Sequence, residues 1–255
     1  GSGQWAVDLA FSEGAHTVIA IARDAAGNMV SDVRSVTIDT VAPMLEVTSP
    51  DYVLTNAPSV VVAGSTEPGV TLTVNGDPVS VGSSGDFTTT ITLVGGSNTI
   101  TVVATDAAGN AATVVKTVTL DDVAPAVAIT SPEDGALLND AVVHISGTAE
   151  AGAQVTVNGV MVMVNGGLWS IDLVFSEGDH AIVVVAEDSA GNTATASRTV
   201  TIDTVPPALT LSSPEGGLTK DAGATVEGMT EAGVTLTVNG HAVTVDSSGA
   251  SKMSR

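Results

Sequence analysis

The sequence predicts an all-β protein made of small β-sandwiches in tandem, and three observations lead to this prediction. The chain repeats with a period of 82 residues, since the segment Asp24–Asn28 returns at 106–110 and, with one substitution, at 188–192. Such a period indicates a string of similar domains. Aromatic residues make up only 2% of a chain that is 44% hydrophobic, so its cores must consist mainly of Val, Ile, Leu and Ala. Short alternating apolar runs rich in β-branched residues lie between turn signals, and no stretch has a helical period.

The period divides the chain into two complete repeats and two half repeats. We expect the complete repeats at 41–122 and 123–204. Residues 1–40 correspond to the second half of a repeat, and residues 205–255 correspond to a first half with a tail. The tail starts at Ala250 and does not resemble the repeat. The prediction is therefore two whole domains, with the two halves of one further, split domain at the termini.

Turn signals separate seven short strands within 41–122. Asn75 and Gly76 are expected to form a two-residue hairpin turn, because both residues tolerate a positive φ. Phe87 and Leu93 share one face of an alternating segment, and we expect that face to be buried. Turns every eight to twelve residues are typical of an immunoglobulin-like sandwich. The expected strands are 45–48, 59–64, 71–74, 79–81, 87–93, 98–105 and 113–120.

Four segments of the chain also carry a family resemblance. They are 39–43 (Asp-Thr-Val-Ala-Pro), 66–69 (Thr-Glu-Pro-Gly), 73–76 (Thr-Val-Asn-Gly) and 104–110 (Ala-Thr-Asp-Ala-Ala-Gly-Asn). With them the chain resembles the bacterial immunoglobulin-like (Big-type) repeats that occur in tandem in prokaryotic surface adhesins and related extracellular proteins. The resemblance covers everything except the tail. It implies an extracellular or cell-surface location and a role as a spacer, a stalk or a binding tip.

The charge and composition exclude several classes of partner. Seven basic residues against 28 acidic ones give a net charge of −21, which repels nucleic acid and anionic membrane surfaces. There is no cysteine, so the domains must be stable without disulfides. No apolar run is long enough to insert into a membrane. Because the sequence has neither a starting Met nor a signal peptide, we expect a mature or excised portion of something larger.

The two half repeats are expected to expose apolar faces, because half a sandwich cannot bury its inner side. The first half is expected to have strands at 5–11, 17–23 and 34–38, and the second half at 209–211, 225–227, 235–238 and 243–245. The expected self-assembly interface combines the inward-facing residues of both halves. These residues are Trp5, Val7, Leu9, Phe11, Val18, Ala20, Leu209, Leu211, Val226, Leu236, Val238, Val243 and Val245.

Two interpretations of these faces remain open. The two whole domains between them, each roughly 35–40 Å long, keep the ends of one chain apart. The second half from another copy would then complete the first half of this one, and repetition would give a head-to-tail filament. Alternatively, the chain is a stalk or spacer segment of a giant surface adhesin, and adjoining repeats of the same chain cover both faces. Either way we expect a semi-rigid rod.

Acidic turns are expected to gather at one pole of each sandwich, because successive strands alternate in direction. Converging carboxylates can hold calcium through several oxygens, and calcium often stiffens the joints of related families. The alternative is that these Asp and Glu side chains cap backbone N–H groups within their turns. The candidate ligands are Asp24, Asp39, Glu67, Asp106, Asp121, Asp122, Glu150, Asp188, Asp203 and Glu231.

We expect no catalytic centre. His16 and His180 occupy the same Glu-Gly-x-His position, which indicates a repeated surface loop rather than a reactive group. Trp5, Phe87 and Trp169 recur once per repeat and are expected to be core anchors rather than sugar-stacking platforms. The sequence thus predicts a non-enzymatic structural rod or fibre that requires no cofactor, with calcium as the one candidate ligand. The competing hypothesis is a ligand-binding module for a sugar or a protein.

Overall fold

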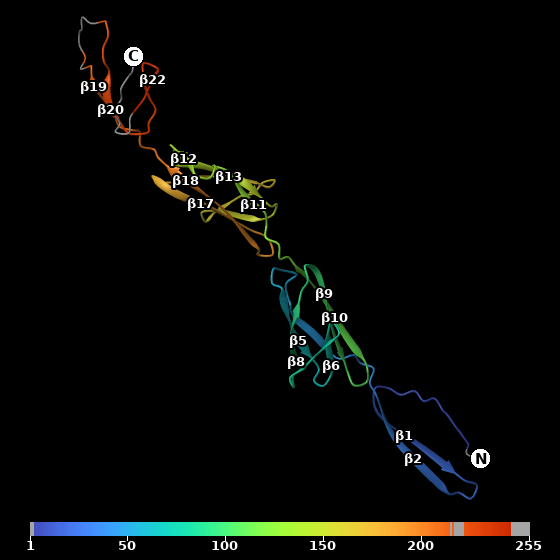
Figure 1. Ribbon diagram of the computed structural model, residues 1–255. Helices are drawn as coiled ribbons and strands as arrows, with labels where there is room; N and C mark the ends of the chain where they lie inside the picture. Colours follow the sequence, from blue (N-terminus) through green and yellow to red (C-terminus); the bar gives the residue numbers. More distant parts are fainter. Residues whose placement is uncertain (1–2, 215, 217–221, 246–255) are drawn as a thin grey trace. The chain divides into compact units, whose positions relative to one another are not determined.

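The structure is a computed structural model that describes residues 3–214, 216 and 222–245. Every regular element within these ranges is a β-strand, as the ribbons in Figure 1 show, so the all-β prediction is confirmed. None of the described residues forms a helix that is long and apolar enough to span a membrane. The tail from Ala250 and the segment 246–249 lie outside the described residues.

The repeat at 41–122 contains eight strands in two sheets. One sheet has the order β3-β5-β8 and the other the order β4-β10-β9-β6-β7. The two-residue strand β4 pairs in parallel with the end of β10 and was not among the seven strands that the sequence predicts. The strands are β3 (Leu45–Ser49), β4 (Leu54–Thr55), β5 (Ser59–Thr66), β6 (Thr71–Val74), β7 (Asp77–Val79), β8 (Asp86–Thr92), β9 (Gly96–Thr105) and β10 (Ala111–Leu120).

The core of this repeat lies between its two sheets and consists mostly of valine, leucine and isoleucine, as the composition predicts. Alternate residues of each strand point inward, which is the period of a pleated strand. Phe87 is the one aromatic residue of this cluster and is 4% exposed. The buried members are Val47, Val60, Val62, Leu72, Val74, Phe87, Leu93, Ile100, Val102, Ala104, Val118 and Leu120.

The predicted hairpin turn between β6 and β7 is confirmed. Asn75 and Gly76 have φ angles of 52° and 91°, so both residues take the left-handed conformation that this turn requires. The side-chain oxygen of Asn75 accepts a hydrogen bond from the backbone N–H of Thr101 (2.8 Å), which ties the turn to β9. The returning strand begins at Asp77 rather than at 79, because a two-residue turn pairs the next residue directly with Val74.

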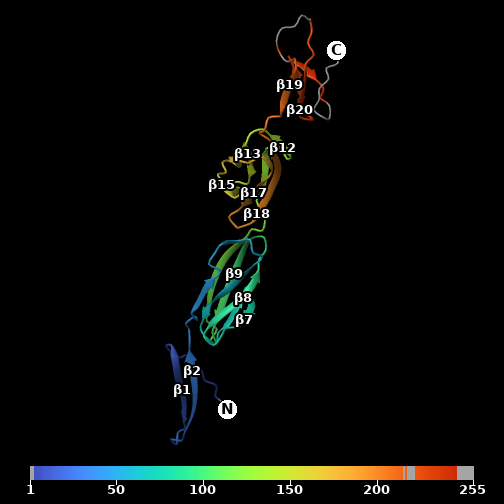
Figure 2. The same ribbon diagram turned by 90° about the vertical axis from the view of Figure 1, so that its left-hand side faces the viewer.

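The repeat at 123–204 has the same topology. Its sheets have the orders β11-β13-β16 and β12-β18-β17-β14-β15. Trp169 in β16 pairs with Gly147 in β13, just as Phe87 pairs with Gly64 in the preceding repeat, and it is 3% exposed. The strands, several of which are labelled in Figure 2, are β11 (Val127–Ser131), β12 (Ala136–Leu138), β13 (Val142–Ala149), β14 (Gln154–Val157), β15 (Val160–Val162), β16 (Leu168–Val174), β17 (Gly178–Glu187) and β18 (Thr193–Ile202).

The described parts of the half repeats form two-stranded sheets. Figure 1 shows β1 and β2 as a long hairpin, whereas the segment before β1 is drawn as coil. The prediction of a strand at 5–11 is therefore wrong for this structure. The strand expected at 225–227 lies instead at Glu227–Thr230, and the one expected at 243–245 lies at His241–Val243, where it directly follows a two-residue turn. The strands of the two halves are β1 (Gly14–Arg23), β2 (Met29–Ile38), β19 (Leu209–Ser213), β20 (Glu227–Thr230), β21 (Leu236–Val238) and β22 (His241–Val243).

Candidate functional site: the open faces of the two half repeats

The half repeats form all the strand pairings that a half can form by itself. In the repeat at 41–122, the first half contributes the pairs β3–β5 and β6–β7, and the second half contributes β9–β10. The corresponding pairs in the half repeats are β19–β20, β21–β22 and β1–β2. The register of β19 on β20 repeats that of β3 on β5, including the irregularity at the third pair. The sequence of one half repeat is therefore sufficient to form these strand pairs.

Two described segments of the half repeats, 3–13 and 223–226, are not strands. In a complete repeat, the only partner of each corresponding segment belongs to the other half. In β5, the residues Ala63–Thr66 pair with β3, whereas 59–62 pair only with β8. The strand β20 corresponds to Ala63–Thr66 alone, and 223–226 are not in a strand. Likewise 3–13 correspond to β8 and β16, whose partners β5 and β13 come from a first half. The absence of a partner thus explains the wrong strand predictions at 5–11 and 225–227.

The open face of the N-terminal half repeat carries the expected aromatic anchor in an exposed position. Trp5 is 74% exposed, and Val7 and Leu9 are also exposed, whereas the corresponding Phe87 and Trp169 are buried in the complete repeats. Phe11, Val18 and Ala20 are half-buried. Trp5 lines an open groove together with Ala20 and Ala22 of β1. All these residues occupy positions that are inside the sandwich elsewhere in the chain.

The open face of the C-terminal half repeat is a groove of about 240 Å³ between the pairs β19–β20 and β21–β22. Leu211 in the groove is 69% exposed, whereas the corresponding Val47 is 8% exposed. Leu209 is also exposed, and the remaining members of the expected interface are half-buried. These members are Val226, Leu236, Val238, Val243 and Val245. The groove is therefore lined by core positions of a sandwich.

A glycine in the second strand of each first half marks where the aromatic ring sits. A Cβ added at Gly64 would lie 2.8 Å from the ring of Phe87, and one added at Gly147 would lie 2.2 Å from the ring of Trp169. Only glycine permits so close an approach of a ring to the backbone. Gly228 occupies the same position in the C-terminal half repeat, where a Cβ would meet the backbone oxygen of Thr210 at 2.2 Å. Its nearest neighbours include no aromatic ring.

The acidic turns are occupied by hydrogen bonds to the chain itself. Oδ1 of Asp106 accepts hydrogen bonds from the backbone N–H groups of Ala108, Gly109 and Asn110 at 2.7–2.9 Å. The hydrogen bond from the Asn110 side chain, followed by the backbone hydrogen bonds, lowers the pKa of Asp106, while partial desolvation opposes the shift. Asp24 and Asp188 lie in the equivalent turns of their own repeats. The pKa of Asp24 is lowered chiefly by Asn28, and that of Asp188 chiefly by Asn192.

Two of these turns also connect to an Asp that lies 71 residues earlier. The side-chain nitrogen of Asn110 donates to the backbone oxygen of Asp39 (3.0 Å), and that of Asn192 donates to the backbone oxygen of Asp121 (2.8 Å). The structure thus brings Asp39 and Asp106 together, and Asp121 and Asp188 together, through one asparagine each.

The other candidate ligands cap backbone N–H groups near the start of each repeat. Glu67, Glu150 and Glu231 accept hydrogen bonds from Met44, Ala126 and Ala208, in that order, at 2.9–3.3 Å. Asp203 accepts one from Val205 (3.3 Å). No group of three or more His, Asp or Glu residues within the described ranges is arranged to hold a metal ion. Calcium binding at the candidate ligands, Asp122 included, therefore stays a prediction.

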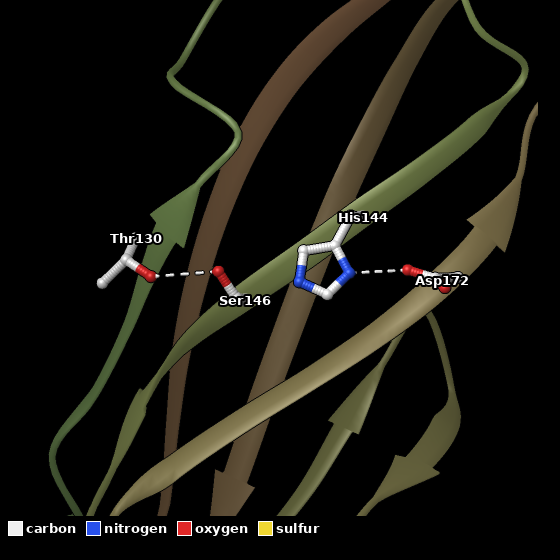
Figure 3. Close-up of polar contacts among 4 residues, drawn as sticks. All are labelled: Thr130, His144, Ser146 and Asp172. Atoms are coloured by element: carbon white, nitrogen blue, oxygen red, sulfur yellow. Dashed lines mark hydrogen bonds and ion pairs between the residues drawn. The ribbon is translucent and has the colours of Figure 1, made fainter.

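The structure also gathers a polar row on the outer face of the sheet β11-β13-β16, which the sequence analysis missed. Figure 3 shows His144 and Ser146 on β13, flanked by Asp172 on β16 and Thr130 on β11. Nδ1 of His144 lies 2.6 Å from Oδ1 of Asp172, and the hydroxyls of Ser146 and Thr130 lie 3.3 Å apart. His144 and Asp172 are both largely exposed. Only the register of β13 on β16 brings them together, so no sequence signal could have revealed this pair.

His16 and His180 make the same contacts in their two loops. Nε2 of each ring lies 2.7 Å from a backbone oxygen four residues earlier, that of Ser12 or Ser176. Each imidazole ring also lies about 5 Å, in a tilted arrangement, from the ring of the phenylalanine five residues earlier, Phe11 or Phe175. These contacts support the interpretation of a repeated loop element.

The folds described above define a protein of tandem immunoglobulin-like β-sandwiches. The chain belongs to the family described as glucodextranase, domain B, which matches residues 43–122 and 125–204. The family described as bacterial Ig-like domain (group 3) matches residues 169–249. The resemblance to bacterial Ig-like repeats is therefore confirmed. Immunoglobulin-like repeats are typically not enzymes, and the absence of a catalytic centre stays a prediction for this chain.

Several known proteins are similar to this chain. Bacillopeptidase F of Bacillus subtilis (strain 168) is 32% identical over 175 residues, which cover 65% of this chain and 12% of the length of that protein. The fibronectin(III)-like modules of Clostridium thermocellum CbhA are 20% identical, with a TM-score of 0.41 over 62% of this chain and 94% of theirs. A 1.5-MDa bacterial ice-binding adhesin is 23% identical, with a TM-score of 0.37 over 75% of this chain and 76% of that structure.

Proposed function

We propose that this chain is a structural stalk or spacer of an extracellular or cell-surface protein, and that its copies join head to tail by completing a split sandwich. The tandem immunoglobulin-like repeats of the matched families support the structural role. The open faces of the two half repeats support the joining of copies. In this joint, the N-terminal half repeat of one copy packs against the C-terminal half repeat of a second copy.

One observation carries the proposal: within the described residues, the segments 3–13 and 223–226, which are not strands, are those that need a partner from the opposite half. In the complete repeats, β5 and β13 each pair with the following aromatic strand over seven residue pairs. The same register would place Trp5 of one copy opposite Gly228 of the other, and Val7 opposite Val226. The ring would then cover the glycine, as Phe87 covers Gly64. Each half thus offers what the other requires.

The two halves also match in the hydrogen bonds that an asparagine side chain makes at one pole of each complete sandwich. Asn110 and Asn192 each bond an Asp backbone oxygen 71 residues earlier. Asn28 occupies the same turn position, and its side chain donates to the Asp24 carboxylate (2.8 Å). Asp203 is the repeat equivalent of Asp39 and Asp121. In the proposed joint, the backbone oxygen of Asp203 in one copy accepts the hydrogen bond from Asn28 of the other.

The two tryptophans allow a direct test, because Trp5 and Trp169 are the only ones in the chain. Trp169→Phe leaves Trp5 as the single probe and introduces the residue that the neighbouring repeat has at this position. We expect the molar mass, measured by light scattering in about 0.15 M salt to screen the net charge, to rise with concentration. The Trp5 emission should move to shorter wavelength and become less accessible to acrylamide over the same range.

Two substitutions of Trp5 provide matched variants. Trp5→Asp places a charge in the core of the joint and should keep the protein monomeric at every concentration, since an unpaired buried charge is strongly unfavourable. Trp5→Phe should still assemble, because Phe87 fills this position in a complete repeat. Electron microscopy should show fibres of uniform width for Trp5→Phe and separate particles for Trp5→Asp.

Two results would overturn the head-to-tail joint. One is a monomeric mass with an exposed Trp5 at all concentrations. The other is a monomeric mass with a buried Trp5, which would mean that the two halves of one chain close on each other. Neither result would affect the stalk or spacer role, which rests on the family match.

A further inference from the structure

An arginine in the complete repeat at 123–204 ties its two sheets together. Arg198 in β18 donates from Nη1 to the backbone oxygen of Pro132 (2.9 Å) and from Nη2 to that of Ile129 (2.6 Å). Its guanidinium is part-buried in this position. Ile129 belongs to β11, which lies in the other sheet, so the forked guanidinium bridges the two sheets by binding two carbonyls at once.

The N-terminal half repeat carries an arginine at the same position. Arg34 precedes the inward-facing Val36 in β2 by two residues, as Arg198 precedes the buried Val200 in β18. The side chain of Arg34 is 78% exposed and lies 3.1 Å from Asp32. An exposed ion pair of this kind contributes little, so the guanidinium can leave it at small cost.

The C-terminal half repeat carries the matching acceptors. Leu211 and Pro214 are the repeat equivalents of Ile129 and Pro132. The register of β19 on β20 matches that of β3 on β5. The hydroxyl of Ser213 also donates to the backbone oxygen of Thr225 (3.0 Å), just as that of Ser49 donates to the backbone oxygen of Val61 (3.0 Å). The carbonyls that bind an arginine in a complete repeat are therefore on one half, and the arginine is on the other.

We infer that Arg34 is the specificity-determining residue of the joint between two copies. In the joint, its guanidinium donates to the backbone oxygens of Leu211 and Pro214 of the second copy, and so bridges β2 of one copy to β19 and the residue that follows it in the other. This inference rests on the proposed head-to-tail joint and names the polar contact that selects the C-terminal half repeat as its partner.

The repeat at 41–122 provides the natural comparison, because Lys116 stands at this position in β10. A lysine has a single ammonium group and cannot present the planar fork that reaches two carbonyls. Arg34→Lys therefore keeps the charge of the side chain and removes only the fork. Lys116→Ala removes the same charge from a repeat that is already complete, and controls for the altered net charge.

The experiment measures the protein concentration at which half of the chains are assembled, using Trp5 fluorescence in the Trp169→Phe chain. Every variant is measured at one urea concentration, chosen so that this midpoint for the parent falls in the measurable range. Two charge-assisted hydrogen bonds predict that Arg34→Ala raises this concentration by about 10- to 100-fold. Arg34→Lys should recover only a small part of the loss. Lys116→Ala should shift it by less than about threefold.

The possible results separate the failure of this inference from the failure of the joint itself. If the parent chain assembles and Arg34→Ala has the same half-assembly concentration as Lys116→Ala, the Arg34 contact is wrong and the joint stands. Full recovery with Arg34→Lys would mean that charge alone matters, which also overturns the forked contact. If the parent chain never assembles, both the joint and the Arg34 contact are wrong.

Discussion

The complete repeat at 41–122 and the divided repeat at the two ends of the chain have nearly the same sequence pattern but different degrees of order. In the complete repeat, eight strands form two sheets around a valine-rich core. Among the described residues of the divided repeat, the strand pairs are β1–β2, β19–β20 and β21–β22, and the segment that carries Trp5 is not a strand. The difference teaches that hairpins form from local information, whereas the strand with the aromatic anchor forms only when its partner strand is supplied.

The largest effect is expected at the glycine beneath the aromatic ring. A Cβ in Gly147→Ala would lie 2.1 Å from the backbone oxygen of Ala128 as well as against the Trp169 ring, so strand and ring must both move. We expect the repeat to lose about 3 kcal/mol or more of unfolding free energy. Urea unfolding of the Trp5→Phe chain, monitored by Trp169 fluorescence, measures this loss. The exposed neighbour change Thr148→Ala should cost far less, and equal midpoints for both would contradict the close contact.

The same substitution in the divided repeat sharpens the comparison. Gly228→Ala meets the oxygen of Thr210 but no ring in the monomer. We expect the Trp169 unfolding transition to keep its midpoint, while assembly followed through Trp5 is lost. If Gly228→Ala assembled as readily as the parent chain, Trp5 would not sit over this glycine.

A smaller effect is expected at the asparagine of the hairpin turn. Asn158 has a φ of 47°, and its side-chain oxygen accepts a hydrogen bond from the backbone N–H of Val183 (2.8 Å). Asn158→Ala should cost about 2 kcal/mol in the Trp169 unfolding transition, because it combines backbone strain with a lost hydrogen bond. Asn158→Gly removes the hydrogen bond without the strain and should cost about 1 kcal/mol. A larger loss for Gly than for Ala would exclude this explanation.

The equivalent turn in the divided repeat should behave differently. Asn239 has a φ of 48°, so its turn is already formed. Its side-chain partner by repeat equivalence is the backbone N–H of Ile19, which a second copy would supply. We expect Asn239→Gly to leave the Trp169 transition unchanged and to weaken assembly. If Asn239→Gly weakened both the Trp169 unfolding transition and assembly, the turn would also stabilise the complete repeat at 123–204, which contradicts a role confined to the joint.

The smallest effect concerns acid stability. The hydrogen bond from Asn192 and those from the backbone lower the pKa of Asp188 in the folded protein. A lowered folded pKa stabilises the fold above the unfolded pKa of about 3.9, and this contribution disappears as the pH falls through the folded value. Trp169 unfolding should therefore become easier as the pH falls below about 4, and Asp188→Asn should flatten this dependence. A steeper dependence in the variant would contradict the assigned cause.

Asp24 provides the comparison within the divided repeat. Its pKa is lowered for the same reason, by Asn28 and the backbone of its own turn. Because these partners are local, its titration, followed by NMR, should be depressed in the monomer before any joint forms. An ordinary pKa for Asp24 in the monomeric Trp5→Asp variant would mean that even this turn depends on the other half.

Particular residues show what sequence reasoning could and could not predict. The Asn75-Gly76 turn and the burial of Phe87 follow from positive φ and from alternation, and both are confirmed. The short strand β4 was missed because its pairing with β10 is made between distant parts of the repeat. The pairing of His144 with Asp172 was missed for the same reason, since it depends on the register of two strands.

The sequence by itself determined the repeat, the strand-rich composition, the turn residues and the inward face of each strand, because these properties depend on neighbours within a few positions. Tertiary structure decided which segments actually become strands. A strand such as β5 needs a hydrogen-bond partner along its whole length, and over 59–62 that partner is β8. The corresponding residues 223–226 have only the backbone of their own half and are not in a strand. The physical reason is that an edge without a partner cannot satisfy its backbone groups or cover its apolar side chains.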